Sequence, residues 1–299
     1  MCGIVGLFIK NKALEPQLGA MMATMLATMC ERGPDSAGFA VYGTGRCGTI
    51  KLTLRGPAGT DFAAISKKIE RVANGAVKIT PRDTHAVLEI PTAAESDVRD
   101  ELAAVAPDVS IVGLGTRMEI YKEVGVPTDV TRRFELEKMS GTHGIGHTRM
   151  ATESAVTTAG AHPFSTGADQ CLVHNGSLSN HAGLKRELKR QGMTFETDND
   201  TEVAAAYISN RLKGGDSLGE ALKACLDDLD GFYTFVVGTE TGFGVLRDPI
   251  SCKPAIMAET DDYVAFGSEY RVLAGLPNIE KAKIWEPEPA KVYFWQRAA

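Results

Sequence analysis

Near the start of the chain, apolar positions switch between the periods of strands and helices. Residues 4–9 form a short apolar run that predicts a buried strand, and residues 16–30 carry leucine and methionine at the spacing of one helix face. Methionine commonly fills gaps in cores, so we expect this helix to face the interior. A glycine–proline turn follows, and residues 39–43 and 49–54 are predicted to form a pair of strands.

The stretch from about residue 58 to residue 140 differs in character from what surrounds it. Its pattern predicts helix, strand, helix and strand over residues 61–73, 84–90, 95–106 and 108–115. Residues 118–129 are expected to be a connector. We therefore predict one domain over residues 1–299 with a small α+β insertion at about 58–140.

In the second half of the chain, apolar runs and glycine-containing turns alternate. Two strands are predicted near residues 141–152 and 170–180, and closely spaced strands return after residue 231. Three helical patterns lie between these groups, and the second of them has Asp200 or Thr201 as its expected cap. The pattern indicates a mixed α+β fold with many strands, mostly antiparallel in this half.

The composition is that of an ordinary soluble globular protein. Of 299 residues, 43% are hydrophobic and 23% are charged, and the net charge is −6. No clustered basic stretch indicates nucleic acid binding, no apolar run is long enough for a membrane span, and the N-terminus lacks a signal-peptide pattern. The six cysteines are scattered without metal-site spacing, so we expect no metal and a reducing, cytoplasmic environment.

Cys2 needs separate treatment among the cysteines. Removal of Met1 would leave its thiol and a free α-amine on the same carbon. An α-amine has an unperturbed pKa of roughly 7.7–8.0, so near neutral pH it can accept the thiol proton and create the attacking thiolate. The same amine, once protonated, can donate to a leaving group. By itself, a cysteine at this position is weak support for catalysis.

Further motifs follow Cys2 along the chain. They are RGPDSAG at residues 32–38, GHTRMAT at 146–152, HNG at 174–176 and DNDTE at 198–202. Together with the start MCGI, they resemble the class II glutamine amidotransferases, whose glutaminase domain uses an N-terminal nucleophile. RDP at 247–249 and GSE at 267–269 resemble later strands of the amidophosphoribosyltransferase-like branch.

The resemblance implies a role for each matched residue. Arg149 would hold the substrate carboxylate, since a guanidinium can pair with it bidentately, and Asp200 would receive the substrate ammonium group. Asn175 and Gly176 would donate to the oxyanion that forms when Cys2 attacks the side-chain amide.

Three more residues belong to the same implied pocket. Arg32 and Gly33 would orient the terminal amine and close over glutamine, and Thr152 would line the pocket. The resemblance also implies the fold, a four-layer α/β/β/α sandwich of two antiparallel sheets with helices outside. It implies a reaction in which a glutamyl thioester on Cys2 is hydrolysed, giving glutamate and ammonia.

Simpler explanations exist for each residue taken alone. Arg149 would most often be a surface ion pair, HNG a hairpin turn, and Asp200 a helix cap. All of these features together, in the family order behind Cys2, are improbable as coincidence.

The acceptor of the ammonia is not defined by these motifs. The sequence has no P-loop, no dinucleotide-binding glycine turn and no cysteine cluster for iron–sulfur, so no cofactor is expected in this chain. The layout resembles the stand-alone glutaminase subunit of glutamate-synthase-like enzymes, including the N-methylglutamate synthase type, which implies L-glutamine as substrate and synthase subunits on separate chains. Two alternatives stay open: a hydrolase of another γ-glutamyl compound, and a non-catalytic regulatory module. The insertion is hypothesised to be a docking surface for a partner.

Overall fold

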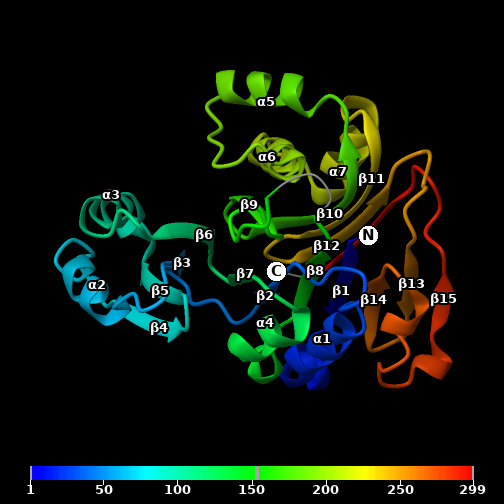
Figure 1. Cartoon of the computed structure of the whole chain (residues 1–299), viewed down its shortest axis with the longest axis horizontal. Coiled ribbons are helices and arrows are strands. Elements are labelled where there is room, and N and C mark those ends of the chain that lie inside the picture. The colour runs from blue at the N-terminus through cyan, green and yellow to red at the C-terminus, as the bar shows by residue number, and fades with distance from the viewer. Residues whose placement is uncertain (1, 152–154, 298–299) are drawn as a thin grey trace.

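Seven antiparallel strands form the first of three sheets in the computed structural model, which describes residues 2–151 and 155–297 (Figure 1). Their order is β15-β13-β14-β1-β8-β2-β7. The strands are β1 (Gly3–Ile9), β2 (Ser36–Tyr42), β7 (Met118–Val124), β8 (His143–Arg149), β13 (Ile256–Glu259), β14 (Tyr263–Gly267) and β15 (Lys283–Trp285). The apolar run after Cys2 forms β1, which is buried along its whole length because both faces of the sheet are covered.

The second sheet has five antiparallel strands in the order β16-β12-β11-β10-β9. They are β9 (Phe164–Gly167), β10 (Gln170–Leu178), β11 (Gly231–Gly238), β12 (Gly242–Arg247) and β16 (Val292–Gln296). The side chains of Ile4, Phe8, Val173 and Phe243 belong to the core between the two sheets. At Gly6, a Cβ would lie 2.7 Å from the Phe243 ring, so glycine lets the sheets approach there.

Helices cover the outer face of each sheet. They are α1 (Leu18–Ala27) and α4 (Pro127–Arg133) on the first sheet, and α6 (Asp200–Lys213) and α7 (Leu218–Asp228) on the second, with α5 (His181–Arg190) packed against α6. The methionine side of α1 is buried against the first sheet, as the helical spacing predicted. This arrangement of helix, sheet, sheet and helix confirms the expected four-layer fold (Figure 1).

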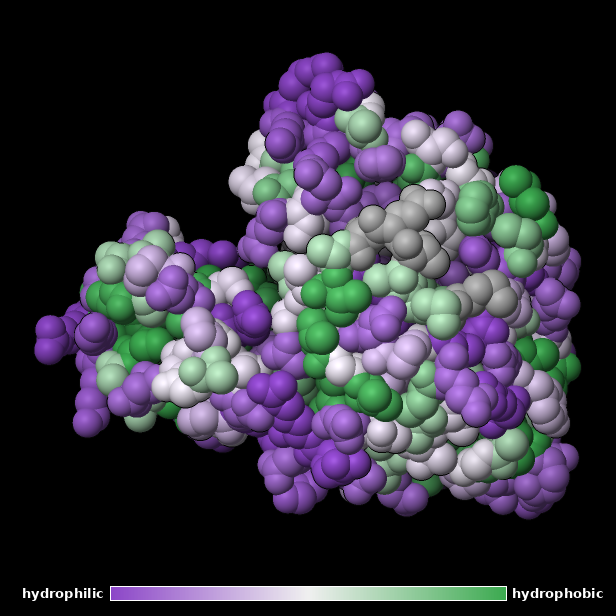
Figure 2. Space-filling model, viewed as in Figure 1, coloured by the Kyte–Doolittle hydropathy of each residue, from purple (hydrophilic) through white to green (hydrophobic). Residues whose placement is uncertain are grey.

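The outermost helix is polar. Only Leu188 of α5 is buried, and hydrophilic side chains cover this helix at the top of the molecule (Figure 2). Among the helices of the described residues, none is long and apolar enough to cross a membrane.

A third sheet forms a satellite unit, which we define as residues 49–115. Its strand order is β4-β5-β3-β6, and two helices pack against it around a separate aliphatic core. The elements are β3 (Thr49–Arg55), α2 (Phe62–Ile69), β4 (Lys78–Arg82), β5 (His85–Pro91), α3 (Glu95–Val105) and β6 (Ser110–Gly115). The unit projects from one side of the four layers, which we call the body (Figures 1 and 2).

The structure differs in three ways from what the sequence pattern predicted. β2 pairs with β7 and β8, and β3 pairs with β5 and β6, so the expected pairing of residues 39–43 with 49–54 is wrong. The expected connector at 118–129 contains β7, an edge strand of the first sheet, and the start of α4. The stretch 58–140 therefore divides: the satellite unit starts earlier, at residue 49, and residues 118–140 belong to the body.

Charged residues hid β7 from the pattern. Glu119, Lys122 and Glu123 interrupt its apolar positions, but Lys122 and Glu123 are buried and Glu119 pairs with Lys51 at 2.7 Å. Tertiary contacts satisfy these charges, so charged residues can occupy buried positions of the strand. The apolar–polar alternation that identifies a half-exposed strand is therefore missing.

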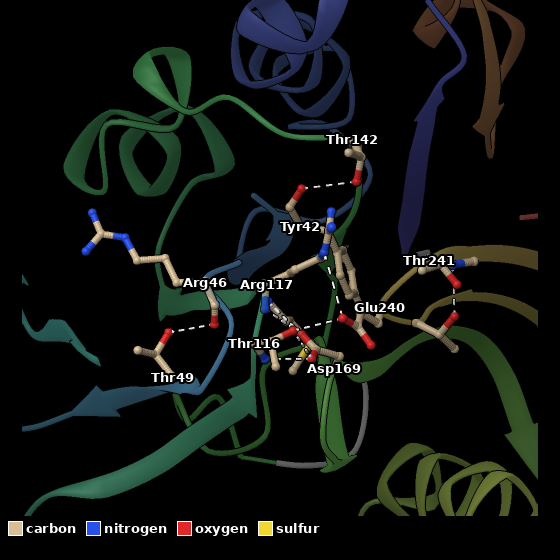
Figure 3. Close-up of polar contacts among 12 residues, drawn as sticks. Tyr42, Arg46, Thr49, Thr116, Arg117, Thr142, Asp169, Glu240 and Thr241 are labelled. Atoms are coloured by element: carbon tan, nitrogen blue, oxygen red, sulfur yellow. Dashed lines mark hydrogen bonds and ion pairs between the residues drawn. The ribbon is translucent and has the colours of Figure 1, made fainter. Parts of the chain in front are cut away.

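One carboxylate of the body binds the end of the satellite unit through backbone N–H groups. Asp169, in the turn between β9 and β10, accepts hydrogen bonds from the backbone N–H groups of Thr116, Arg117 and Met118 at 2.6, 2.9 and 2.9 Å (Figure 3). These three residues follow β6, the last strand of the satellite unit. The satellite unit is therefore tied to the second sheet as well as to the first.

Candidate active site

Cys2 lies at the start of β1, where distant motifs meet. Arg32 Nε and Asn175 Nδ2 donate to the carbonyl oxygen of Cys2 at 3.2 and 3.3 Å. The Cys2 thiol is half-buried and lies 3.9 Å from the carbonyl oxygen of Met150. The residue that the sequence singled out is thus held by side chains from both sides of the sandwich.

The GSE motif fixes the start of β1. Ile4 N–H donates to Ser268 Oγ at 2.9 Å, and Ser268 N–H donates to the carbonyl oxygen of Ile4 at 3.0 Å. Glu269 pairs with Arg32 at 2.6 Å. The Arg32 guanidinium holds the pKa of the Glu269 carboxyl below its usual value. Together these contacts hold Arg32 against the backbone of Cys2.

Gly33 lies too close to the end of β8 for any side chain. A Cβ at Gly33 would lie 2.4 Å from the carbonyl carbon of Thr148 and 2.5 Å from the backbone nitrogen of Arg149. Two residues later, the carboxylate of Asp35 accepts a hydrogen bond from Ala151 N–H at 2.7 Å. The RGPDSAG turn therefore positions the chain that carries Arg149.

Asn175 and Gly176 lie inside β10, with Gly176 opposite Tyr233 of β11. The reading of HNG as a hairpin turn is therefore wrong. Gly176 has φ of +148°, and a Cβ there would lie 2.0 Å from the carbonyl oxygen of Phe232. The RDP motif supports this strand pair, because the Asp248 carboxylate accepts a hydrogen bond from Tyr233 N–H at 3.0 Å.

A cavity of about 390 Å³ brings together two of the three charged residues predicted for the site, Arg149 and Asp200. The other lining residues are Ala155, Thr157, Ala159, Gly160, His181, Thr197, Asp198 and Asn199. Arg149 is only 7% exposed, and its Nη1 donates to the carbonyl oxygen of Ala155 at 3.3 Å. An opening with a fixed cation and a fixed anion can bind a zwitterion such as a free amino acid.

Asp200 is ionised and is not the helix cap. Asn199 caps α6, with its side chain accepting from Thr201 N–H at 2.9 Å, so the expected cap was placed one or two residues too late. Burial raises the pKa of Asp200, but contacts with His174 and with the N–H of Leu178 outweigh it and hold the pKa below the usual value. The carboxylate is therefore a charged wall of the cavity.

A cluster of buried histidines lies behind the site. His162 Nε2 and His174 Nδ1 lie 2.9 and 3.0 Å from Thr201 Oγ1, and the His147 ring stacks on His162 with centroids 3.9 Å apart. Burial lowers the pKa of His147 to about 3, so this histidine is neutral. His162 carries no motif, and no signal in the sequence pointed to it. Among the described residues, no three His, Cys, Asp or Glu side chains are arranged to hold a metal.

Seven of the eight predicted site residues lie in this region, at one end of the two sheets. They are Cys2, Arg32, Gly33, Arg149, Asn175, Gly176 and Asp200. The eighth, Thr152, lies outside the described residues, as does Met1, whose removal the mechanism requires.

Comparison with known proteins shows the family of the chain. A family profile described as a glutamine amidotransferase domain matches residues 147–275. A protein from Rhizobium meliloti (strain 1021), the glutamine amidotransferase-like protein GlxB, is 62% identical over 100% of both chains. A putative glutamine amidotransferase from Methanothermobacter thermautotrophicus is 32% identical over 98% of this chain and 99% of its own length.

The chain belongs to the glutamine amidotransferase family.

The solved structures support the fold of this glutamine amidotransferase. The glutamine phosphoribosylpyrophosphate amidotransferase of B. subtilis has a TM-score of 0.62 and 22% identity, and covers 99% of this chain. A second solved chain, described as the allosteric regulatory enzyme of purine biosynthesis, has a TM-score of 0.65. The present chain spans 47% of each of these two solved chains.

Membership of the family makes the protein an amide-hydrolysing enzyme with glutamine as its substrate. The profile match includes four site residues, Arg149, Asn175, Gly176 and Asp200, and begins after Cys2. Only the folded structure brings these four residues into the same region as Cys2.

Proposed function

We propose that this glutamine amidotransferase forms a glutamyl thioester on Cys2 and delivers ammonia to a synthase subunit carried on a separate chain. The observation that carries the proposal is the cavity that Arg149 and Asp200 both line. Met150 follows Arg149 in the chain, and its carbonyl oxygen lies 3.9 Å from the Cys2 sulfur. Two opposite charges at a fixed separation recognise the α-carboxylate and α-ammonium groups of glutamine. They leave its side chain to extend toward the thiol.

The first step is attack by the Cys2 sulfur on the δ-carbonyl carbon of glutamine. In the mature chain, the free α-amine of Cys2 takes the thiol proton as the carbon–sulfur bond forms. The tetrahedral oxyanion is stabilised by Asn175 and by the backbone N–H of Gly176. The Asn175 amide has two N–H donors, so it can hold the Cys2 carbonyl with one and reach the oxyanion with the other.

Collapse of this intermediate breaks the carbon–nitrogen bond. The Cys2 ammonium group donates its proton to the leaving nitrogen, so ammonia departs and the thioester remains. Water then attacks the thioester, with the same amine as base. The products are glutamate and the free thiol.

A separate synthase chain is proposed because the layout of the motifs resembles that of stand-alone glutaminase subunits. We propose a partner of the glutamate-synthase or N-methylglutamate-synthase type. Tagged protein isolated from its own cells is expected to retain a synthase-type chain. Isolation as a lone protein with full glutaminase turnover would contradict this part of the proposal.

Covalent labelling tests the chemistry directly. A glutamine analogue with an electrophilic side chain should raise the mass of the mature chain by that of one bound analogue, located on the peptide that starts with Cys2. Excess glutamine should protect this cysteine, and Cys252, which is exposed, should stay unlabelled under the same conditions. Absence of label on Cys2 with the partner present would overturn the mechanism. Preferential hydrolysis of another γ-glutamyl compound would show that glutamine is not the substrate.

A further inference from the structure

Residues 155–163, which we call the cavity segment, form one wall of the glutamine cavity. Ala155, Thr157, Ala159 and Gly160 all contribute to its lining. The segment has no regular secondary structure. Its position must therefore come from side chains of neighbouring elements.

Lys122 of β7 holds the cavity segment through three backbone carbonyls. Its Nζ donates to the carbonyl oxygens of Ala159, Ala161 and Pro163 at 3.3, 3.0 and 3.4 Å. The side chain is 6% exposed, and Nζ lies 4.6 Å from the centre of the Phe164 ring. A buried ammonium group is costly without hydrogen bonds, so its burial and the fold of the segment stabilise one another.

Glu123, the next residue of β7, holds the same segment and also contacts the satellite unit. Its buried carboxylate accepts a hydrogen bond from Thr158 Oγ1 in the cavity segment. It accepts another from Thr84 Oγ1 at 3.3 Å. Thr84 lies in the turn between β4 and β5, so one carboxylate joins the cavity wall to the satellite unit.

The β4–β5 turn is docked firmly beside this carboxylate. Arg133 of α4 donates to both carboxylate oxygens of Asp83, at 2.5 and 2.9 Å. The same arginine lies 3.8 Å from the Glu123 carboxylate, and Arg82 pairs with Glu135 at 3.0 Å. The turn can therefore transmit a displacement of the satellite unit to Glu123.

We propose that Glu123 is a positioning residue that connects Thr84 of the satellite unit to Thr158 of the cavity segment, so that the satellite unit sets the affinity of the cavity for glutamine. This inference rests on the proposed function, since it takes glutamine as the occupant. If the cavity segment is ordered in only a fraction of the molecules, the apparent affinity for glutamine is the intrinsic affinity multiplied by that fraction. Loosening it raises KM and leaves kcat unchanged, because other contacts hold Cys2.

Two isosteric substitutions test the two ends of this connection. Thr158→Val is expected to raise KM roughly threefold to tenfold, and Thr84→Val roughly twofold to fivefold, as the loss of one hydrogen bond does. For both, kcat should change less than about twofold. The double variant should match Thr158→Val alone, because no contact remains to transmit the second change. Thr84→Ser keeps the hydroxyl and should restore the wild-type KM.

Lys78→Ala is the matched control. It removes the exposed Lys78–Glu89 ion pair of the same sheet, at 2.8 Å, and leaves the β4–β5 turn intact. Its KM should equal that of the wild type. A wild-type KM for Thr84→Val, or additive effects in the double variant, would overturn the connection.

Hydrogen exchange separates this inference from the proposed function. In the intact chain without glutamine, Thr84→Val should speed amide exchange over residues 155–163, whereas Lys78→Ala should not. Unchanged exchange in that segment would refute the connection whether or not the protein hydrolyses glutamine. Wild-type protein that fails to hydrolyse glutamine, while the exchange result holds, would refute only the proposed function.

Discussion

The body and the satellite unit are built from the same parts and use their polar residues differently. Both have an antiparallel sheet with helices against it and a hydrophobic core. In the satellite unit, some charged side chains pair locally, as Lys78 does with Glu89 and Arg99 with Glu95, and others dock the unit on the body. In the body, polar groups from distant segments meet at Cys2. The proposed site is therefore assembled from segments of both sheets of the body.

The two regions also differ in what their glycines do. Gly33 in the body and Gly176 beside the site are pressed against backbone atoms, at 2.4 and 2.0 Å from a hypothetical Cβ. Gly59 of the satellite unit has φ of +83° but open space around it. Glycine in the body permits close approach, whereas at Gly59 it permits a turn.

The largest expected effect comes from removing the nucleophile of the body. Cys2→Ala should lower kcat/KM for glutamine by at least about a thousandfold, because no other thiol is placed to form the thioester. Cys47→Ala, an exposed cysteine just before the satellite unit, should keep wild-type activity. Ammonia release measures both. Equal activity in the two variants would show that Cys2 is not the nucleophile.

The next effect is on the oxyanion. Asn175→Ala should lower kcat by roughly 100- to 1,000-fold with a small change in KM, because its amide is needed in the transition state. Asn180→Ala removes an amide that donates to the carbonyl oxygen of Asp228 at 2.9 Å and accepts from Asp230 N–H at 3.1 Å, and should leave kcat unchanged. A loss confined to KM in the Asn175 variant would assign this residue to ground-state binding.

Glycine substitutions should separate the regions by stability. Gly33→Ala should lower the free energy of unfolding by roughly 3 kcal/mol, since its Cβ meets backbone that must move. Gly59→Ala should cost about 1 kcal/mol, the cost of a left-handed backbone with a side chain. Urea unfolding measures both values. Similar costs would show that the close packing at Gly33 relaxes easily.

The pH dependence of stability tests whether the two regions unfold together. Burial lowers the pKa of His85 in the satellite unit and of His143 in the body to about 3. Unfolded histidine titrates near about 6.5, so between these values the unfolded chain binds more protons and stability falls as pH falls. Each histidine should contribute about 1.4 kcal/mol per pH unit in that window and nothing above it.

His85→Gln and His143→Gln should each remove this slope, as urea unfolding at a series of pH values would show. If the satellite unit unfolds together with the body, the two variants should lose equal slopes in one transition. A slope change for His85→Gln that appears in a separate, earlier transition would show that the satellite unit unfolds on its own.

Local patterns predicted the elements whose burial is simple. The run in β1 and the methionine side of α1 are buried on regular periods, so their positions followed from spacing alone. β7 could not be found in this way, because Lys122 and Glu123 are buried by partners far along the chain. Strand pairing failed for the same reason, since β2 and β3 are neighbours in sequence but belong to different sheets.

The site divides along similar lines. The identities of Cys2, Arg149, Asn175 and Asp200 were apparent because their motifs resemble a family, and each chemical type suits a part of glutamine. His162 and Glu123 were invisible, because each acts through contacts with residues that no local pattern links to it.

Residue type and short-range spacing were enough to predict a nucleophile and groups that can bind an amino acid, and to predict much of the alternation of strands and helices. Only the tertiary structure decided that Asn199 caps α6 and leaves the Asp200 carboxylate for the cavity, and that Glu123 joins the satellite unit to the cavity segment. The physical reason is that a buried charge is tolerated only where distant segments supply its partners, and those partners exist only once the chain has folded.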